Sequence, residues 1–344
     1  MIVLVWLSGE NERLARAELA GAVARLGGTL TPSGMGEEST GRAYVQLAGR
    51  NDAVELSRRL ALARRCAEPW PELAPPEVEQ RLRRAGASGR SAAFQWVPGT
   101  RGARPGDALQ RLGAAYRLGG GRISLEHPDQ RYWLEATAGQ DWRILEELGE
   151  VNRTSFAERR TSRLPFQRPV TLPPRFARAL VNLARIGPGD RVVDPFVGTG
   201  SLLVEAALLG ARTVGVDVDA AMIRGTLDNF AHLGRVPEAL RQGDAAAAAE
   251  EFPPASFDAL VTDPPYGRAS GTRREPPERL WGRALSAWTD RVRPGGRIGV
   301  VVPAGGSLPP IDARLEIAIP QRVHRSLTRE FRVYVRAGTA PSDQ

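Results

Sequence analysis

The chain has 344 residues, of which 42% are hydrophobic, so it is long enough for two or three globular domains with buried cores. Its formal net charge is +8, and all 47 basic residues are arginines because the sequence contains no lysine. The only cysteine is Cys66, which excludes an internal disulfide and a thiolate metal cluster. The basic charge favours a nucleic-acid surface, and a GC-rich genome would also explain the arginines.

The apolar runs are short. Residues 2–7 form one of the longest, far below the roughly 20 residues of a membrane-spanning helix. No basic segment precedes this run, so we expect no signal peptide and a cytoplasmic protein. Three histidines, His127, His232 and His324, lack the spacing of metal ligands, and we expect no metal.

Strands and helices alternate through the first 150 residues. Apolar periodicity predicts strands at 2–7, 42–47, 92–97, 122–125 and 131–137, and helices at 10–26, 52–63, 77–86 and 107–117. The first strand-helix-strand-helix repeat is typical of a ferredoxin-like α+β domain, which we place at residues 1–66. The proline-rich stretch 69–76 marks a boundary, so a second α+β domain would occupy residues 67–150.

Arginines gather in this second domain and after it. Arg101 and Arg104 lie in a glycine-rich stretch, which favours RNA backbone binding, although a solvated basic surface is an alternative. We interpret residues 151–174, rich in proline, as a linker whose basic side chains would face phosphates: Arg159, Arg160 and Arg163. Aromatic residues inside the strands are expected to be core: Phe94, Trp96, Tyr132 and Trp133.

The pattern changes at residue 175. Predicted strands lie at 191–194, 213–217, 259–262, 297–302, 313–319 and 331–336, and predicted helices at 175–185, 200–209, 219–233 and 277–291. This alternation predicts a doubly wound α/β sheet over residues 175–344, with an antiparallel end.

A glycine-rich turn follows the first of these strands, where Asp194, Pro195 and Phe196 precede Gly198, Thr199 and Gly200. A dinucleotide fingerprint would need a third glycine at position 203, which is leucine, and a carboxylate at the strand end would repel a pyrophosphate. The same carboxylate would attract the cationic S-adenosylmethionine, whose single carboxylate suits the helix N-terminus.

Acidic residues also end the next strands. Asp217, followed by Val218, can accept the two ribose hydroxyls, whereas Asp219 is better placed to cap the next helix. Asp244, followed by Ala245, ends a third, less clear strand and can accept the adenine amine.

The strand at 259–262 ends in Asp263-Pro264-Pro265-Tyr266. Prolines cannot continue a strand ladder, so a carboxylate, a free carbonyl and an aromatic ring are held at the sheet edge. An exocyclic amine of a nucleobase is a weak nucleophile. Asp263 and the Pro264 carbonyl could accept its two hydrogens while Tyr266 stacks on the base.

Residues 163–268 resemble the tRNA (guanine-N2) methyltransferases that modify guanine 10, of the archaeal type and the related eukaryotic catalytic subunit. The motifs that carry the resemblance are Leu164-Pro-Phe-Gln-Arg-Pro169, the run from Asp194 to Gly200, and Thr262-Asp-Pro-Pro-Tyr-Gly-Arg268. Residues 123–159 resemble the end of a THUMP domain, the RNA-binding module of that family. The resemblance implies bound S-adenosylmethionine, a tRNA substrate contacted by residues such as Arg268, and a catalytic segment at 263–266.

The sequence thus predicts ferredoxin-like and THUMP-like α+β domains followed by a Rossmann-fold class I methyltransferase domain. Methylation of another guanine, at tRNA position 6 or in rRNA, or of adenine N6 in DNA, stays open as an alternative, as does a non-catalytic RNA-binding protein. The arginine- and proline-rich loop 268–279 departs from the family pattern and bears on the target. A small activator subunit and a monomeric state are both compatible with the sequence.

Overall fold

The computed structural model describes the chain except for residues 32–40, 99–105, 138–140, 170, 266–274 and 339–344. It divides into two compact units. The first consists of Met1–Leu7, Gly28–Arg58 and Arg64–Glu150, and the second of Ser8–Gly27, Arg59–Ala63 and Val151–Gln344. No helix within the described ranges is both long and apolar enough to cross a membrane.

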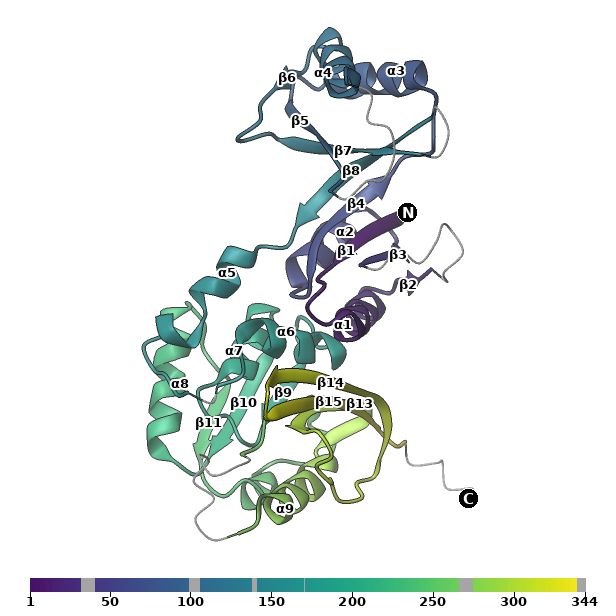
Figure 1. Ribbon diagram of the computed structural model, residues 1–344. Coiled ribbons are helices and arrows are strands. Elements are labelled where there is room, and N and C mark those ends of the chain that lie inside the picture. The colour runs from purple at the N-terminus through teal and green to yellow at the C-terminus, as the bar shows by residue number, and fades with distance from the viewer. Residues whose placement is uncertain (32–40, 99–105, 138–140, 170, 266–274, 339–344) are drawn as a thin grey trace. The chain divides into compact units, whose positions relative to one another are not determined.

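The first unit is built on one eight-stranded sheet with the order β2-β3-β1-β4-β8-β7-β5-β6 (Figure 1). Its strands are β1 (Ile2–Leu7), β2 (Thr29–Leu30), β3 (Arg42–Gln46), β4 (Ala63–Pro69), β5 (Ser91–Trp96), β6 (Arg122–Ile123), β7 (Gln130–Ala136) and β8 (Trp142–Glu150). Strands β4 and β8 were not expected from the sequence, and they pair antiparallel from Arg65 opposite Glu150 to Pro69 opposite Leu145. The sheet is therefore continuous across residue 66, where we expected the first domain to end. The ferredoxin-like and THUMP-like assignments stay predictions.

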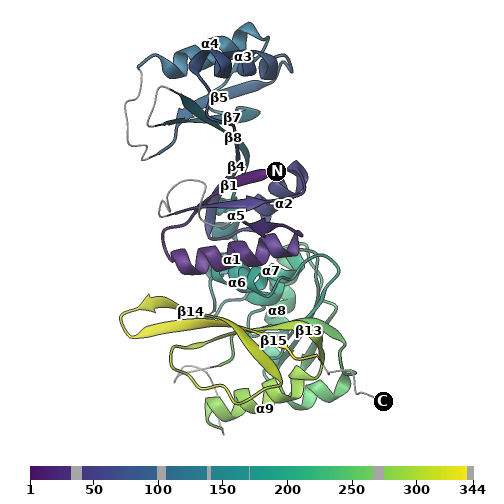
Figure 2. The ribbon, with the colours of Figure 1, turned by 90° about the vertical axis from the view of Figure 1, so that its right-hand side faces the viewer.

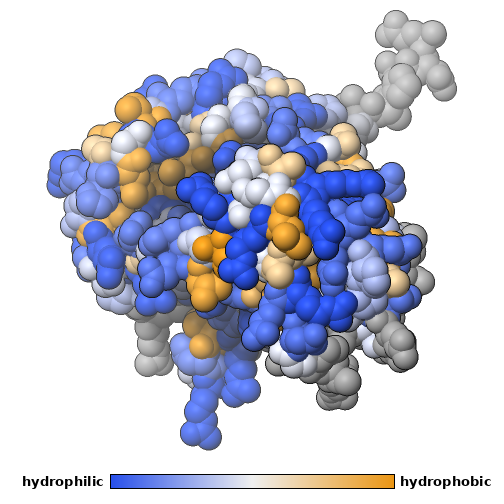
Figure 3. Space-filling model, turned by 90° about the horizontal axis from the view of Figure 1, so that it is seen from above, coloured by the Kyte–Doolittle hydropathy of each residue, from blue (hydrophilic) through white to orange (hydrophobic). Residues whose placement is uncertain are grey.

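Helices α2 (Arg50–Arg59), α3 (Pro75–Gly86) and α4 (Ala108–Leu118) belong to this part of the chain. An aromatic core lies under α3 and α4, where the rings of Phe94 and Tyr132 stack with centroids 5.3 Å apart. Three of the four aromatic residues expected in the core are buried, and Trp96 is partly buried. The surface seen from the end of the molecule at which α3 and α4 lie is mainly hydrophilic, with separate apolar patches (Figure 3).

The second unit contains a seven-stranded sheet with the order β11-β10-β9-β12-β13-β15-β14. Its strands are β9 (Arg191–Asp194), β10 (Arg212–Asp217), β11 (Ala239–Gln242), β12 (Phe257–Thr262), β13 (Val292–Pro303), β14 (Ala313–His324) and β15 (Leu327–Arg336). Strands β9 to β13 are parallel, and the hairpin β14–β15 is antiparallel. This arrangement confirms the predicted Rossmann-like α/β sheet with its antiparallel end, where β14 and β15 follow β13 (Figure 2).

Helices cover both faces of this sheet. They are α6 (Pro174–Leu183), α7 (Ser201–Leu208), α8 (Ala220–His232) and α9 (Pro277–Thr289). On one face Trp281 and Trp288 of α9 pack on Val193 and other alternate residues of the central strands. On the opposite face α6 approaches Gly299, because a Cβ there would lie 3.1 Å from Leu180. The carboxyl ends of the parallel strands are left at one edge, where such sheets bind ligands.

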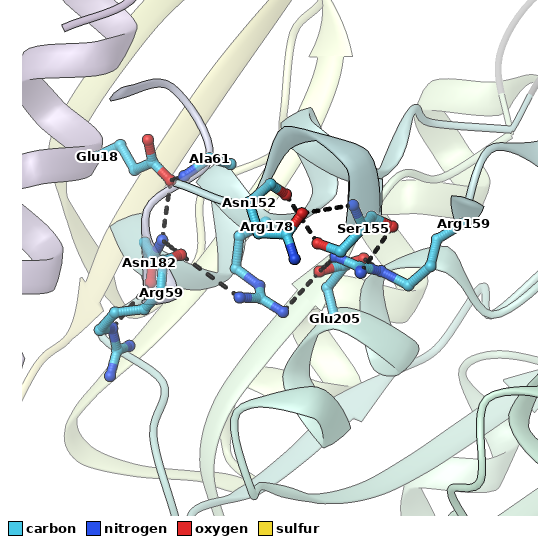
Figure 4. Close-up of polar contacts among 9 residues, drawn as sticks. All are labelled: Glu18, Arg59, Ala61, Asn152, Ser155, Arg159, Arg178, Asn182 and Glu205. Carbon is cyan, nitrogen blue, oxygen red and sulfur yellow. Dashed lines mark hydrogen bonds and ion pairs between the residues drawn. The ribbon is translucent and has the colours of Figure 1, made fainter. Parts of the chain in front are cut away.

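An N-terminal helix, α1 (Glu12–Arg25), belongs to this second unit. The Glu18 carboxylate is fully buried and accepts hydrogen bonds from the amides of Ala61 and Leu62, each 2.8 Å long, and from Asn182 Nδ2 at 2.9 Å (Figure 4). Burial raises the pKa of Glu18. Because Asn182 lies on α6, this cluster fixes α1 and residues 59–63 to the helix beside the central strands.

A buried ion-pair cluster continues from α6 to α7. Glu205 of α7 is 2.7 Å from Arg178 and 2.8 Å from Arg159 (Figure 4). Arg159 directly follows a short helix, α5 (Arg153–Glu158), so this pair fastens the segment predicted as a linker to the sheet unit. The cluster also holds α7, the helix that begins at the glycine turn.

Candidate active site

The glycine turn after β9 is shaped by hydrogen bonds to its first residue. Oδ1 of the buried Asp194 accepts the amide of Phe196 at 3.0 Å and the hydroxyl of Thr262 at 2.7 Å. Gly200 begins α7 with φ of 82°, and a Cβ there would lie 2.7 Å from Thr226. Both the left-handed backbone and the close approach therefore require glycine at this position.

The pKa of Asp194 is raised to about 7, chiefly because burial disfavours the charged form. The neighbouring carboxylates of Asp263 and Asp217 raise it further, and the hydrogen bonds from Thr262 and Phe196 oppose them. Asp194 is thus a carboxyl group whose charge a nearby cation would strongly favour.

Asp217 and Asp219 take the different positions that the sequence indicated. Asp217 Oδ2 accepts the amide of Gly198 at 2.9 Å, and its Oδ1 accepts that of Asp219 at 2.9 Å. A carboxylate offers about four lone-pair directions, so this side chain can still accept a hydrogen bond from a hydroxyl. Asp219 caps α8, as predicted, by accepting the amide of Ala221 at 2.8 Å.

Asp244, after β11, has a partner that sequence reasoning missed. Its carboxylate receives both terminal nitrogens of Arg283, at 2.6 and 2.9 Å, and Oδ1 also accepts the amides of Ala246 and Ala247. Hydrogen bonding to Arg283 lowers the pKa of Asp244 to about 2. Glu275 completes the group, because its Oε2 lies 3.1 Å from Arg283.

Strand β12 delivers Thr262 and Asp263 to the same edge of the sheet. The Pro265 carbonyl accepts a hydrogen bond of 2.9 Å from the indole of Trp281, a buried residue of α9. The turn that carries Asp263 is therefore held from outside its own strand. Tyr266 and Arg268 lie outside the described residues.

A cleft of about 1260 Å³ joins these parts. It is lined by nine of the ten predicted cofactor residues, namely Asp194, Pro195, Phe196, Gly198, Thr199, Asp217, Val218, Asp244 and Ala245, together with Asp263. The tenth, Gly200, is the N-cap of α7 and does not line the cleft, and Pro264 lies between two lining residues without being one. Arg168, which the sequence indicated only as a basic residue of the linker, also lines the cleft. Sequence reasoning did not single out six further lining residues: Thr171, Met222, Gln242, Glu275, Leu280 and Arg283.

The segment before α6 closes one side of the cleft. Phe166 is held by Asn229 of α8, whose side chain bonds both its amide and its carbonyl at 3.0 Å. Gly225 makes room for the ring, because a Cβ there would lie 2.0 Å from Phe166. Thr171 then reaches Thr199 of the glycine turn, with their hydroxyls 3.1 Å apart.

The arginines predicted to contact RNA have unlike positions. Arg159 is mostly buried and bonded to Glu205, so it cannot meet a phosphate without leaving this pair. Arg160 and Arg163 are exposed. Arg101 and Arg104 lie outside the described residues.

These residues fit S-adenosylmethionine. Asp194 at the glycine turn offers negative charge to the amino acid end of the ligand, and Asp217 offers acceptors to a ribose. Val218, although apolar, is 74% exposed in the cleft and can contact a flat purine. Asp244 next to it offers an acceptor for an amine.

Known proteins share this fold and sequence. The family described as "RMKL-like, methyltransferase domain" matches residues 160–314. The crystal structure of TrmN from Thermus thermophilus aligns with 98% of this chain and all of its own, at a TM-score of 0.50 and 21% identity. Fold, cleft and family match together define an S-adenosylmethionine-dependent methyltransferase domain.

Two relatives specify the family further. The tRNA (guanine(10)-N2)-dimethyltransferase of Methanothermobacter thermautotrophicus is 38% identical over 192 residues, which are 55% of this chain and 56% of that protein. A Methanothermococcus thermolithotrophicus protein named "Probable tRNA (guanine(10)-N2)-dimethyltransferase" is 30% identical over 165 residues, covering 46% of this chain and 97% of that protein. The chain therefore belongs to the family of these tRNA (guanine(10)-N2)-dimethyltransferases, although the match spans little more than half of the first relative's length.

Proposed function

We propose that this protein methylates the exocyclic N2 amine of a guanine in tRNA, at position 10, once or twice. The observation that carries the proposal is the single cleft shared by the cofactor residues and Asp263. Two relatives similar in sequence to this chain are named for this reaction.

S-adenosylmethionine, when bound, supplies a methyl group made electrophilic by the attached sulfonium. The chain's own residues have to make the acceptor nitrogen more nucleophilic. We assign Asp263 to accept one hydrogen of the guanine amine and the Pro264 carbonyl to accept the other, which localises the nitrogen lone pair. Trp281 supports this geometry by its hydrogen bond to Pro265. Much of the rate enhancement would come from such positioning.

Exposed arginines of the segment before α6 are proposed to bind phosphates of the tRNA. Arg160 and Arg163 take this role, whereas Arg159 serves the Glu205 pair. Binding through phosphates predicts that tRNA affinity falls steeply as salt rises, because counterions are released. A flat salt response would remove this part of the proposal.

The decisive experiment follows labelled methyl groups from S-adenosylmethionine into a tRNA transcript and a matched transcript with guanine 10 replaced. Label in the first transcript alone supports the target, whereas equal label in both moves it to another guanine. Asp263→Ala should abolish transfer while tRNA and S-adenosylhomocysteine still bind. Full activity of that variant would refute the catalytic role of Asp263.

A further inference from the structure

Helix α9 bonds two loops of the cleft, the turn after β12 and the loop after β11. The indole of Trp281 bonds the Pro265 carbonyl at 2.9 Å, and that of Trp288 bonds the Ala245 carbonyl at 2.6 Å. Both rings are buried in the core of the sheet unit. One helix thus fixes the catalytic turn at one end and the loop after β11 at the other.

Arg283 projects from this fixed helix into the cleft. It follows Leu280 by three residues, so the two lie on one side of α9, and both line the cleft. Its two terminal nitrogens meet the two carboxylate oxygens of Asp244 separately, a bidentate arrangement that sets the plane of the carboxylate as well as its charge. The Nη2 atom that donates to Asp244 Oδ2 also donates to Glu275 Oε2 at 3.1 Å, which holds the guanidinium in place.

The hydrogen bonds at Asp244 divide unequally between its oxygens. Oδ1 accepts from Ala246, Ala247 and Arg283, whereas Oδ2 accepts from Arg283. A carboxylate oxygen offers two good lone-pair directions, so Oδ1 is saturated and Oδ2 has room for another donor. The donor that the proposed cofactor brings to this loop is the 6-amino group of adenine.

We infer that Arg283 is a positioning residue that orients Asp244 so that Oδ2 reads the 6-amino group of the cofactor's adenine. The inference rests on the proposed function, because it needs a cofactor with an adenine base in the cleft. Arg283 itself touches Asp244 and Glu275. Its effect on the cofactor passes through the orientation of the Asp244 carboxylate.

This role can be tested with two ligands that differ in one group. Binding of S-adenosylhomocysteine is compared by calorimetry with that of its analogue carrying hydrogen in place of the 6-amino group. A hydrogen bond to a charged acceptor is worth roughly 10- to 100-fold in affinity, so the wild-type protein should prefer the amino ligand by about this factor. Arg283→Ala should lose most of that preference while binding of the analogue stays within about threefold.

Three further variants complete the experiment. Arg283→Lys, with a single point charge, should keep part of the preference. Arg279→Ala removes an exposed arginine of the same helix outside the cleft and should leave both affinities unchanged. Asp244→Ala removes the carboxylate that accepts the 6-amino hydrogen bond. It should abolish the preference and serves as the positive control.

Several results would overturn the inference. Equal weakening of both ligands by Arg283→Ala would indicate a general structural role. An unchanged preference for the amino ligand would remove the role of Arg283, and tighter binding of the amino ligand would indicate that Arg283 competes with it. If Asp244→Ala loses the preference and Arg283→Ala keeps it, the proposed function stands and the role of Arg283 is rejected. If the wild-type protein binds neither ligand, the proposed function itself fails.

Discussion

Replacement of Asp194 by asparagine distinguishes two effects of its buried charge. One is its effect on the free energy of unfolding, and the other is its effect on cofactor binding. The side chain is 2% exposed, and its Oδ1 accepts hydrogen bonds from Phe196 and Thr262. An asparagine Oδ1 can accept the same two bonds. The substitution therefore keeps the shape of the glycine turn and removes a buried negative charge.

The expected gain in stability follows from the pKa. In the folded chain the pKa of Asp194 is about 7, whereas its ordinary value is 3.8. This difference of about three pH units corresponds to an upper limit of about 4 kcal/mol. Below about pH 4 the carboxyl is protonated in both states and costs nothing. As pH rises from about 4 to 7, the folded state holds a proton that the unfolded state has lost, so the free energy of unfolding falls.

The assay is urea unfolding of the cofactor-free protein between pH 4.5 and 8. The free energy of unfolding of Asp194→Asn should be only a little higher than that of the wild type at the acidic end. Above pH 7 it should be higher by about 1 to 4 kcal/mol, and the difference then levels off. Asp228→Asn, which removes an exposed carboxylate from α8, is the control for net charge. A difference between Asp194→Asn and wild type that does not change with pH would refute the reasoning.

The substitution that stabilises the fold should weaken cofactor binding. The cationic amino group of S-adenosylhomocysteine needs the ionised carboxylate, so wild-type affinity should rise with pH up to about 7 and then level. Asp194→Asn should bind weakly at every pH. Unchanged binding by this variant would show that the buried charge serves another purpose than cofactor recognition.

Three other substitutions test the supports of the cleft. Trp281→Phe removes the donor to Pro265 and should lower kcat for tRNA methylation severalfold with S-adenosylhomocysteine affinity unchanged by calorimetry; an unaltered kcat would argue against this support. Gly225→Ala places a Cβ 2.0 Å from the Phe166 ring, so cofactor affinity and Tm should both fall, and retention of both would contradict the tight packing. Glu205→Gln removes the ion-pair partner of the buried Arg178 and of the mostly buried Arg159 and should cost about 3–5 kcal/mol in urea unfolding, whereas a loss below about 1 kcal/mol would show that the cluster relaxes.

Local chemistry made much of the second unit predictable. Strands β9 and β10 end in the acids Asp194 and Asp217, and Asp244 and Asp263 follow β11 and β12 within two residues. The carboxyl ends of such parallel strands gather at one edge of the sheet. The cap at Asp219 is equally local, because it depends on an amide two residues away. The cofactor residues of the cleft could therefore be predicted from their positions at the ends of strands in the sequence.

Strands β4 and β8 were not predicted because each mixes apolar and charged residues. β8 carries adjacent charges, Glu146 and Glu147, that look like a solvent-exposed segment. In the structure Glu147 accepts a hydrogen bond from Trp133 and pairs with Arg65, whose guanidinium lies 4.0 Å from the ring centroid of Trp133. Such pairs become visible only when the partner strands are in register.

The membership of α1 in the second unit has a similar cause. Glu18 reads as an ordinary helical glutamate, and its burial depends on amides more than forty residues away and on Asn182. Likewise Arg159 was grouped with exposed arginines because composition does not distinguish it, whereas Glu205 takes it out of that group. A charged residue in an arginine-rich chain acquires its role from the partner that the fold brings to it.

Helix α9 shows why the cleft needs more than its motifs. The motifs supply Asp244 and Asp263 on separate loops, and nothing within either loop sets the distance between them. Trp281, Arg283 and Trp288 bond these two loops from a single helix anchored in the core. Methyl transfer in line requires donor and acceptor to be fixed within a fraction of an ångström. A rigid helix that bonds both loops meets this requirement, and its residues can be recognised only from the assembled fold.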